Sequence, residues 1–191
     1  AVSKTFKLDH ILPLIEHGHV DYGENKVQEA IEKWSEIKSN NNKIKLHLIG
    51  KLQTNKVKIS IKLFDYIHSL DNEKLARKIS DEQKKQNRKP KLFIQVNIGN
   101  ESQKNGIHIK KLGEFYNYCK EQNLNVIGIM CIPPIDDDPE LSFLRMNYLK
   151  KKFNFKELSM GMSSDYLIAV NFNATFLRIG SKIFGQRKSK L

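Results

Sequence analysis

A regular alternation of short apolar segments with amphipathic ones, continued along all 191 residues, constrains the fold of this chain more than any other feature. The short segments are rich in β-branched and aromatic residues and predict strands. They lie at residues 1–4, 20–22, 45–49, 66–69, 91–97, 126–130, 156–160 and 175–179. The segments between them have helical periodicity, at residues 9–17, 24–37, 53–63, 72–86, 109–122, 140–152 and 163–172. A strand–helix unit repeated about eight times predicts parallel strands joined by helical crossovers.

Eight parallel strands favour closure into a (β/α)8 TIM barrel, because closure leaves no strand edge unpaired. Such barrels typically contain about 250 residues, so we expect a chain of 191 to form one domain over residues 1–191, with little room for insertions. A doubly wound open sheet is the alternative fold. Two local signals support the helices: Asp71 is the expected N-cap of the helix that begins at residue 72, and Pro139 is expected at a first helical position. Because the chain opens in what reads as the middle of a strand, we expect that a preceding segment is missing.

Composition narrows the function classes. No stretch approaches the roughly 18 apolar residues of a membrane span, and the basic-then-apolar pattern of a signal peptide is absent, so we expect a cytoplasmic protein with no membrane partner. Cys119 and Cys131 are too few for a disulfide framework and are expected to be buried thiols. The His and Cys residues show no ligand spacing, so no metal site is expected.

The net charge of +12 raises the hypothesis of a nucleic-acid-binding module. The lysines are spread along the whole chain, and their densest runs, at residues 84–89 and 150–152, fall where the predicted helices face solvent. These runs have no interleaved aromatic residues that could stack on bases. Solvated helix faces are therefore the favoured interpretation, and nucleic-acid binding is kept as an alternative.

The last predicted strand leads directly into a candidate phosphate site. Its alternating run, at residues 176–179, stops at Gly180 and Ser181, and a new apolar run opens at Ile183. A strand that turns into a helix at a glycine beside a hydroxyl presents free backbone N–H groups to an anion. Arg178 lies on this otherwise apolar strand, where it needs hydrogen-bond acceptors. The acceptor is either a carboxylate of the core or a ligand.

Polar side chains at the carboxyl ends of barrel strands are the natural candidates for chemistry. In the chain as predicted, these ends carry Lys4, Glu24, Asn25, His47, Gly50, Gln95, Asn97, Met160, Ser163, Arg178, Gly180 and Ser181. They include no pair of carboxylates placed for acid–base work and no Ser–His–Asp set, so no catalytic residue is assigned. Lys4 either reaches the rim of the barrel or holds an aldehyde as a Schiff base. The combination of this lysine with a phosphate site and Arg178 favours the Schiff base. The ligand would then be a phosphorylated pyridine aldehyde.

Blocks of sequence between residues 2 and 187 resemble, in order, the pyridoxal phosphate homeostasis protein family, which shares its barrel with the N-terminal domain of alanine racemases. The blocks are Val2-Ser-Lys-Thr5, Gly23-Glu-Asn-Lys-Val-Gln-Glu29, His47-Leu-Ile-Gly-Lys-Leu-Gln-Thr-Asn-Lys56, Gln95-Val-Asn97 with Lys104-Asn-Gly106, Gly128-Ile-Met130 with Ile132-Pro133, Leu158-Ser-Met-Gly-Met-Ser163 with Asp165, and Arg178-Ile-Gly180 with Ile183-Phe-Gly185 and Arg187. The resemblance covers nearly the whole chain.

The resemblance implies that pyridoxal 5'-phosphate is the cofactor and that Lys4 anchors it as a Schiff base. It implies that Ser163, Gly180 and Ser181 hold the phosphate and that Arg178 approaches the pyridine nitrogen. It assigns Asn25, His47, Gly50 and Met160 to the pocket wall. The chain departs from the family at Lys26, Phe6 and Ser181, which stand where an aromatic residue, a lysine and a threonine are usual. The helix that usually precedes the first strand is expected to be absent.

The function implied is a non-catalytic protein that carries or buffers pyridoxal 5'-phosphate and passes it to apo forms of enzymes that use it. An arginine stays protonated, so it cannot give the ring nitrogen a full proton, and the ring is then a poor electron sink. Racemases with this arrangement add a tyrosine base from a second domain, and none is expected beyond Leu191. A weak racemase and a nucleic-acid-binding module are the alternatives. The sequence shows no coiled-coil seam, so a monomer is expected.

Overall fold

The computed structural model describes residues 1–101, 103–135 and 137–186, so Arg187 of the last sequence block lies outside the described residues. The helices are α1 (Leu8–Glu16), α2 (Val27–Asn40), α3 (Val57–Leu63), α4 (Glu73–Gln86), α5 (Leu112–Glu121), α6 (Pro139–Phe153), α7 (Tyr166–Asn171) and α8 (Ser181–Phe184), with short 3₁₀ turns η1 (Thr54–Lys56) and η2 (Ile109–Lys111). The strands are β1 (Asp21–Glu24), β2 (Lys45–Leu48), β3 (Tyr66–Leu70), β4 (Lys91–Asn97), β5 (Ile107–His108), β6 (Val126–Met130), β7 (Glu157–Met162) and β8 (Phe176–Arg178).

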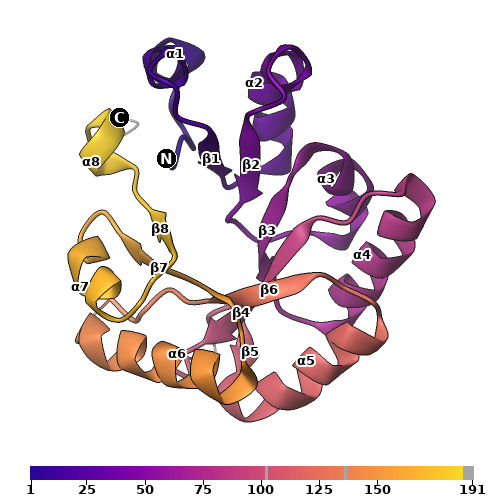
Figure 1. Ribbon diagram of the computed structural model, residues 1–191, viewed down its shortest axis with the longest axis vertical. Helices are drawn as coiled ribbons and strands as arrows, with labels where there is room; N and C mark the ends of the chain where they lie inside the picture. The colour runs from indigo at the N-terminus through magenta and orange to yellow at the C-terminus, as the bar shows by residue number, and fades with distance from the viewer. Residues whose placement is uncertain (102, 136, 187–191) are drawn as a thin grey trace.

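The strands form one parallel sheet in the order β1-β2-β3-β4-β6-β7-β8, with the short β5 paired to β4. Residues 1–3 lie between the two ends of this sheet. The N–H of Val2 donates to the carbonyl of Ile179 at 2.7 Å, and the N–H of Ser3 donates to the carbonyl of Gly23 at 3.0 Å. The sheet is thereby rolled into a nearly closed barrel, and the helices surround it (Figure 1). The predicted (β/α)8 barrel is confirmed, and the doubly wound alternative is wrong.

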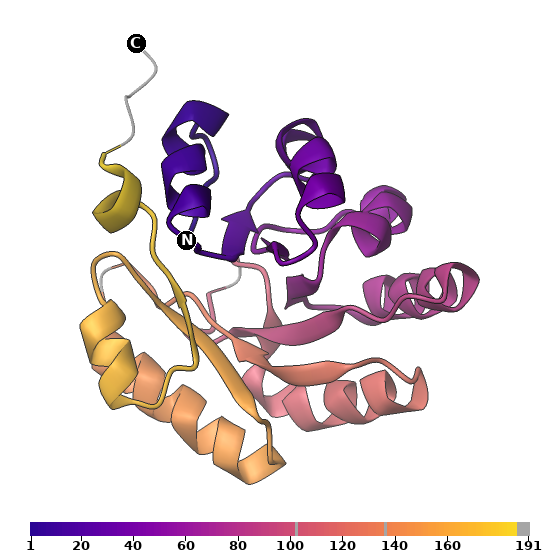
Figure 2. The same cartoon turned by 45° about the horizontal axis from the view of Figure 1, so that its top comes forward.

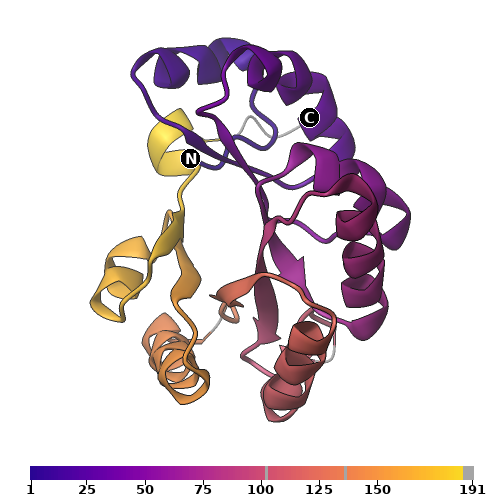
Figure 3. The same ribbon diagram turned by 45° about the vertical axis from the view of Figure 1, so that its right-hand side comes forward.

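The strands are buried on both faces, as is usual for parallel strands at the centre of a barrel. In β4, the side chains of Leu92, Phe93 and Ile94 are all fully buried, although neighbours in a strand point to opposite faces. One face looks into the barrel and the other packs under the helices, which is the usual environment of a parallel strand. Figure 3 shows the strands at the centre with the helices outside them.

Asparagine ends several of the barrel helices. Asn87, Asn123, Asn154 and Asn173, which follow α4, α5, α6 and α7, all have positive φ, between 46° and 64°. Asparagine tolerates this left-handed conformation better than other residues with a β-carbon, so it can close a helix where glycine is usual. The basic runs of α4 and α6 occupy the last turns before Asn87 and Asn154. The negative end of the helix dipole favours lysine there, which accounts for these runs structurally.

Several predicted boundaries need correction. Asn72, rather than Asp71, caps α4, because its side chain accepts the N–H of Leu75 at 2.8 Å. Pro139 does begin α6, as predicted. The strand expected at residues 1–4 is reduced to a single bridge at Val2, since the chain turns at Lys4 and Thr5. Helix α7 starts at Tyr166 instead of residue 163, because Asp165 closes a turn by accepting the N–H of Met162.

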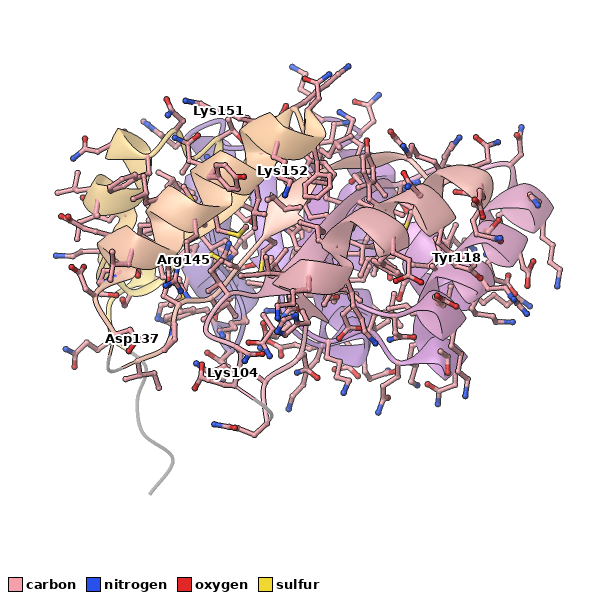
Figure 4. The ribbon with its side chains drawn as sticks, turned by 90° about the horizontal axis from the view of Figure 1, so that it is seen from below. Lys104, Tyr118, Asp137, Arg145, Lys151 and Lys152 are labelled. Atoms are coloured by element: carbon pink, nitrogen blue, oxygen red, sulfur yellow. The ribbon has the colours of Figure 1, made fainter. Side chains whose placement is uncertain are left out.

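The two ends of the barrel carry different segments. Lys104 and Asp137, from the loops that follow β4 and β6, lie at one edge of the molecule, and Lys151, near the end of α6, lies at the opposite edge (Figure 4). The first edge is therefore the end at which the parallel strands finish. Helices α1 and α8 lie side by side across the junction of the first and last strands (Figure 2), where Phe6 packs on Phe184 with ring centroids 5.1 Å apart.

Candidate functional site

A cavity of about 640 Å³ opens at the carboxyl ends of the strands. Its lining comes from loops and strand ends distributed around the barrel: Val2, Lys4, Asn25, Ile49, Gly50, Lys51, Gln95, Asn105, Ile132, Met162, Ser163, Ser164, Arg178, Gly180, Ser181 and Gln186. Two other hollows, of about 600 and 430 Å³, lie on the outer surface between neighbouring helices. We place the candidate site in the first cavity because functional residues of such barrels gather where the strands end.

Seven of the nine predicted binding residues meet in this cavity: Lys4, Asn25, Gly50, Ser163, Arg178, Gly180 and Ser181. The other two do not line it. His47 points to a separate hollow of about 370 Å³, bordered by the first residues of several strands, such as Asp21, Tyr66 and Phe176. Met160 is fully buried in the core of the barrel. Arg178 borders both hollows and therefore lies between the two ends of the barrel interior.

The backbone around Lys4 is held by α2. Lys33 donates from its ammonium group to the carbonyl of Ser3 at 3.0 Å and to the carbonyl of Phe6 at 3.2 Å. The N–H of Thr5 donates to the carboxylate of Glu29 at 2.7 Å. Thr5 itself has φ of +70°, which is uncommon for a β-branched residue and marks local strain. The turn that carries Lys4 is thus fixed on both sides by contacts from one helix.

Glu24 is the buried anchor of this arrangement. Its carboxylate is fully buried and forms an ion pair with Lys33 at 2.7 Å. The same oxygen accepts the hydroxyl of Ser3 at 2.7 Å and the indole N–H of Trp34 at 3.0 Å. Lys33 also pairs with Glu29 at 3.0 Å, one helical turn earlier. Glu24, Glu29 and Lys33, which we call the Lys4 clamp, therefore connect the barrel wall to the residues on both sides of Lys4.

The role of the Lys4 clamp is not predictable from the sequence. Glu24 and Glu29 lie in a block quoted for the family resemblance, but a resemblance does not say which side chain meets which. The spacing of Glu29 and Lys33 by four residues does predict an ion pair on α2. The contact of that pair with residues 3–6 depends on the tertiary fold.

Ser163, Gly180 and Ser181 form one side of the cavity. The N–H of Gly180 donates to the hydroxyl oxygen of Ser163 at 3.1 Å, which joins the loop after β7 to the end of β8. The carbonyl of Gly180 accepts the N–H groups of Ile183 and Phe184, both at 2.9 Å, so the chain turns immediately after Ser181. Two hydroxyls and the first N–H groups of a helical turn are thereby concentrated in one place.

Gly50 is required by the close approach of another loop. A β-carbon at Gly50 would lie 2.2 Å from the carbonyl oxygen of Asn25, and 2.9 Å from that residue's Cα. We expect Gly50→Ala to lower the free energy of unfolding by about 1–3 kcal/mol, because the backbone must move to admit the methyl group. Urea unfolding followed by circular dichroism measures this loss. Gly23→Ala is the matched control, since a β-carbon there comes no closer than 3.5 Å to its neighbours; equal losses in the two variants would contradict the steric account.

Arg178 is buried and held by two neutral acceptors. One terminal nitrogen of its guanidinium donates to the hydroxyl oxygen of Ser159 at 2.8 Å, and the other donates to the carbonyl of Cys131 at 2.8 Å. Burial lowers the pKa of Arg178 from its ordinary value, but an arginine still keeps its charge at neutral pH. The alternative of a core carboxylate as its partner is wrong: among the described residues, Arg178 pairs with a hydroxyl and a carbonyl.

Both cysteines are free and buried, as predicted. Burial raises the pKa of Cys119 and of Cys131 to about 12, so neither thiol is ionised at neutral pH. Over the described ranges, no three histidine, cysteine or acidic side chains gather as a metal site. Among the helices of those ranges, none is long and apolar enough to span a membrane.

The interior histidines predict an acid-sensitive fold. Burial lowers the pKa of His47 below its ordinary value and lowers the pKa of the fully buried His68 further. In the unfolded chain both rings take up protons as the pH falls through about 6.5, whereas the folded protein resists this. The unfolded state then binds more protons, so the free energy of unfolding is expected to fall below pH 6.5 by up to about 1.4 kcal/mol per pH unit for each ring.

Urea unfolding between pH 5 and pH 8 checks this expectation, with His68→Phe as the comparison. That variant keeps a ring beside Phe93 and removes one titrating group, so its stability is expected to depend less steeply on pH. An unchanged slope would contradict the assignment to His68.

Comparison with known proteins places the chain among a defined set of relatives. A family model described as the alanine racemase N-terminal domain matches residues 1–188. The pyridoxal phosphate homeostasis protein of Aquifex aeolicus (strain VF5) is 39% identical over 197 residues, which cover 97% of this chain and 85% of that protein. Among solved structures, PipY of Synechococcus elongatus PCC7942 with PLP bound is 33% identical with a TM-score of 0.87, covering 97% of this chain and 91% of PipY. An alanine racemase of Clostridium difficile 630 shares the fold, with a TM-score of 0.76 at 14% identity, covering 99% of this chain and 52% of the racemase.

Proposed function

This chain belongs to the pyridoxal phosphate homeostasis protein family, and from that premise we propose that it binds pyridoxal 5'-phosphate and holds it for other proteins without strong catalysis of its own. The support is twofold. The relative from Aquifex aeolicus carries that family name, and PipY was solved with the cofactor bound. Independently, the cavity at the strand ends gathers the amine of Lys4, the hydroxyls of Ser163 and Ser181 and the guanidinium of Arg178 from distant parts of the chain.

The residues of the cavity fit the cofactor's three functional groups. The aldehyde needs an amine, and Lys4 lines the cavity on a turn fixed by the Lys4 clamp. The phosphate needs hydrogen-bond donors, which Ser163, Gly180 and Ser181 concentrate on one side. The pyridine nitrogen needs a donor or an acid, and Arg178 supplies a permanent donor. Asn25 and Gly50, which touch each other, close the wall.

The proposal assigns four roles. Lys4 attaches the aldehyde covalently as a Schiff base, with loss of one water molecule. Ser163, Gly180 and Ser181 bind the phosphate, Arg178 donates to the ring nitrogen, and Asn25 and Gly50 form the wall. His47 and Met160 are left out of the proposed pocket, because neither lines the cavity.

The chemistry of Arg178 favours storage of the cofactor over catalysis with it. When bound, pyridoxal 5'-phosphate supplies an aldehyde that reacts reversibly with amines and a ring that can accept electrons. The ring accepts electrons well only if an acid gives its nitrogen a proton, and the Arg178 guanidinium does not give its proton up at neutral pH. This site therefore favours reversible attachment of the cofactor over carbanion chemistry, and a weak racemase activity is the alternative.

The position of Arg178 at the cavity is the main support for reversible attachment over carbanion chemistry. Two assays on the protein loaded with pyridoxal 5'-phosphate test this proposal. Loaded protein mixed with an apo enzyme that requires the cofactor is expected to restore that enzyme's activity, and L-alanine incubated with the loaded protein is expected to remain L-alanine. Racemisation at rates typical of enzymes, about 1 per second or faster, would contradict the proposal. We further propose that the protein acts as a monomer in the cytoplasm and that apo enzymes are its partners.

A further inference from the structure

We propose that Ser159, His68, His47 and Asp21 form a chain of hydrogen bonds through the barrel interior that holds the Arg178 guanidinium in position for the cofactor. This inference rests on the proposed function and deepens it, because it names four positioning residues for the site. None of the four lines the cofactor cavity.

The chain crosses the barrel in four short steps. From Arg178 on β8, the first step leads to the hydroxyl oxygen of Ser159 on β7, at 2.8 Å. Ser159 lies 2.8 Å from Nδ1 of His68 on β3. Nε2 of His68 is 3.1 Å from Nδ1 of His47 on β2, and Nε2 of His47 is 3.0 Å from a carboxylate oxygen of Asp21 on β1. Five strands thus contribute one side chain each.

The Asp21 end fixes the direction of every bond when both histidines are neutral, the form favoured because burial lowers the pKa of each ring. An arginine only donates and an ionised aspartate only accepts. Asp21 therefore requires the proton of His47 on Nε2, which leaves Nδ1 of neutral His47 as an acceptor for Nε2–H of His68. Nδ1 of His68 then accepts the hydroxyl of Ser159, and the Ser159 oxygen is free to accept from Arg178. In this arrangement both histidines are neutral and carry the proton on Nε2.

Burial makes this order costly to break. Ser159 and His68 are 0% and 1% exposed, and His47 is 6% exposed. His68 is stacked on Phe93 with centroids 4.3 Å apart, and His47 is stacked on Tyr66 at 4.2 Å. Removal of one partner from such a buried pair leaves the other polar atom short of a hydrogen bond, which is unfavourable. The chain reaches bulk solvent at Asp21, whose side chain is 50% exposed.

The consequence for the site is that the Ser159 oxygen is held as an acceptor for one nitrogen of Arg178, while the Cys131 carbonyl holds the other. These two bonds use two of the five N–H donors of the guanidinium. The two bonds fix the plane of the Arg178 guanidinium. The donors that they do not use are available to a ligand in the cavity that Arg178 lines.

The test combines a proton assignment with binding measurements at pH 7.5. Long-range ¹H–¹⁵N spectra of the wild-type protein are expected to show His47 and His68 as neutral Nε2–H tautomers, with the resonances assigned from His47→Gln and His68→Gln. Addition of pyridoxal 5'-phosphate is expected to shift the His68 Nδ1 resonance, since the hydrogen bond at Ser159 responds when Arg178 engages the ring. Either histidine found as the Nδ1–H tautomer would overturn the proposal, and this measurement needs no folded variant of Ser159.

Ser159→Ala is expected to weaken binding of pyridoxal 5'-phosphate by about tenfold, the value of one hydrogen bond to a charged group. Ser159→Thr, which keeps the hydroxyl, is expected to recover most of this loss. The matched control is Ser69→Ala. Ser69 is a buried serine of β3, 2% exposed, whose hydroxyl has no hydrogen-bond partner among the described residues, and its loss is expected to change binding less than twofold.

The binding measurements distinguish a failure of the proposed function from a failure of the positioning role. If the wild-type protein binds no cofactor, the proposed function falls and the positioning role falls with it. If the wild-type protein binds and Ser159→Ala binds equally tightly, the positioning role alone is overturned and the proposed function stands.

Discussion

Lys4→Ala is expected to abolish the absorption band of a Schiff base when the protein is mixed with pyridoxal 5'-phosphate. The reason is that Lys4 lines the cavity beside the proposed phosphate site, on a backbone turn that the Lys4 clamp fixes. Loss of the reversible covalent bond is expected to weaken binding by at least about a hundredfold, or about 2.8 kcal/mol. Absorption spectra and equilibrium dialysis of the two proteins measure both effects.

Lys51→Ala is the matched control. Lys51 also lines the cavity, so it tests whether any lysine at the opening can take the aldehyde. We expect this variant to keep the band and to bind within about threefold of the wild-type protein, since a solvated charge contributes little. A band that survives in Lys4→Ala and disappears in Lys51→Ala would transfer the anchoring role to Lys51.

Glu24→Ala is expected to have the largest effect on stability. Glu24 is fully buried, and Lys33, its partner at 2.7 Å, has a side chain that is only 11% exposed. Removing one member of a buried ion pair leaves the other charge without compensation and costs about 3–5 kcal/mol. The hydroxyl of Ser3 and the indole of Trp34 lose the same acceptor. Chemical unfolding of the variant measures the loss.

The same variant tests whether the Lys4 clamp serves the site. We expect Glu24→Ala, at a temperature where it is still folded, to form the Schiff base more slowly and less completely, because the turn around Lys4 is no longer held. Glu32→Ala is the control: Glu32 is an exposed residue of α2, and its carboxylate accepts a hydrogen bond from Gln28 of the same helix at 3.1 Å. A folded Glu24→Ala protein that binds as fast and as tightly as the control would restrict Glu24 to a purely structural role.

Periodicity predicts the barrel well because the local pattern and the tertiary fold agree. Strands β4 and β6 occupy the predicted residues 91–97 and 126–130, since buried parallel strands are short, apolar and bounded by turns. The two-residue β5 has no such pattern and was not predicted; it exists because the loop after β4 returns to pair with Val96 and Asn97. The first strand was overestimated, because hydrogen bonds from α2 divert the chain at Thr5, far from any local signal.

The site is predictable where the residue type itself carries the chemistry. Lys4, Ser163, Arg178 and Gly180 could be selected from the sequence because an amine, a hydroxyl, a guanidinium and a glycine lie at strand ends. The residues that hold these side chains in position could not be selected in this way. A serine in a strand gives no sign that it accepts from an arginine 19 residues later.

His47 shows the limit of the strand-end argument. It lies one residue before the end of β2, but its side chain turns into the barrel toward Asp21 at the start of β1. The side chains of a strand alternate between its two faces, and the tilt of a barrel strand decides which inward side chains rise to the open end. That tilt is a property of the closed sheet and is not encoded within five residues of sequence.

Identification of the lysine that reacts with the cofactor tests directly whether Lys4 carries it. The wild-type protein would be mixed with one equivalent of pyridoxal 5'-phosphate, reduced with borohydride, digested and mapped by mass spectrometry. In a chain with 33 lysine and arginine residues, nonspecific reaction would spread the label over many surface lysines. We expect one modified residue, Lys4, at close to full occupancy. Label distributed over other lysines, with Lys4 unmodified, would contradict it.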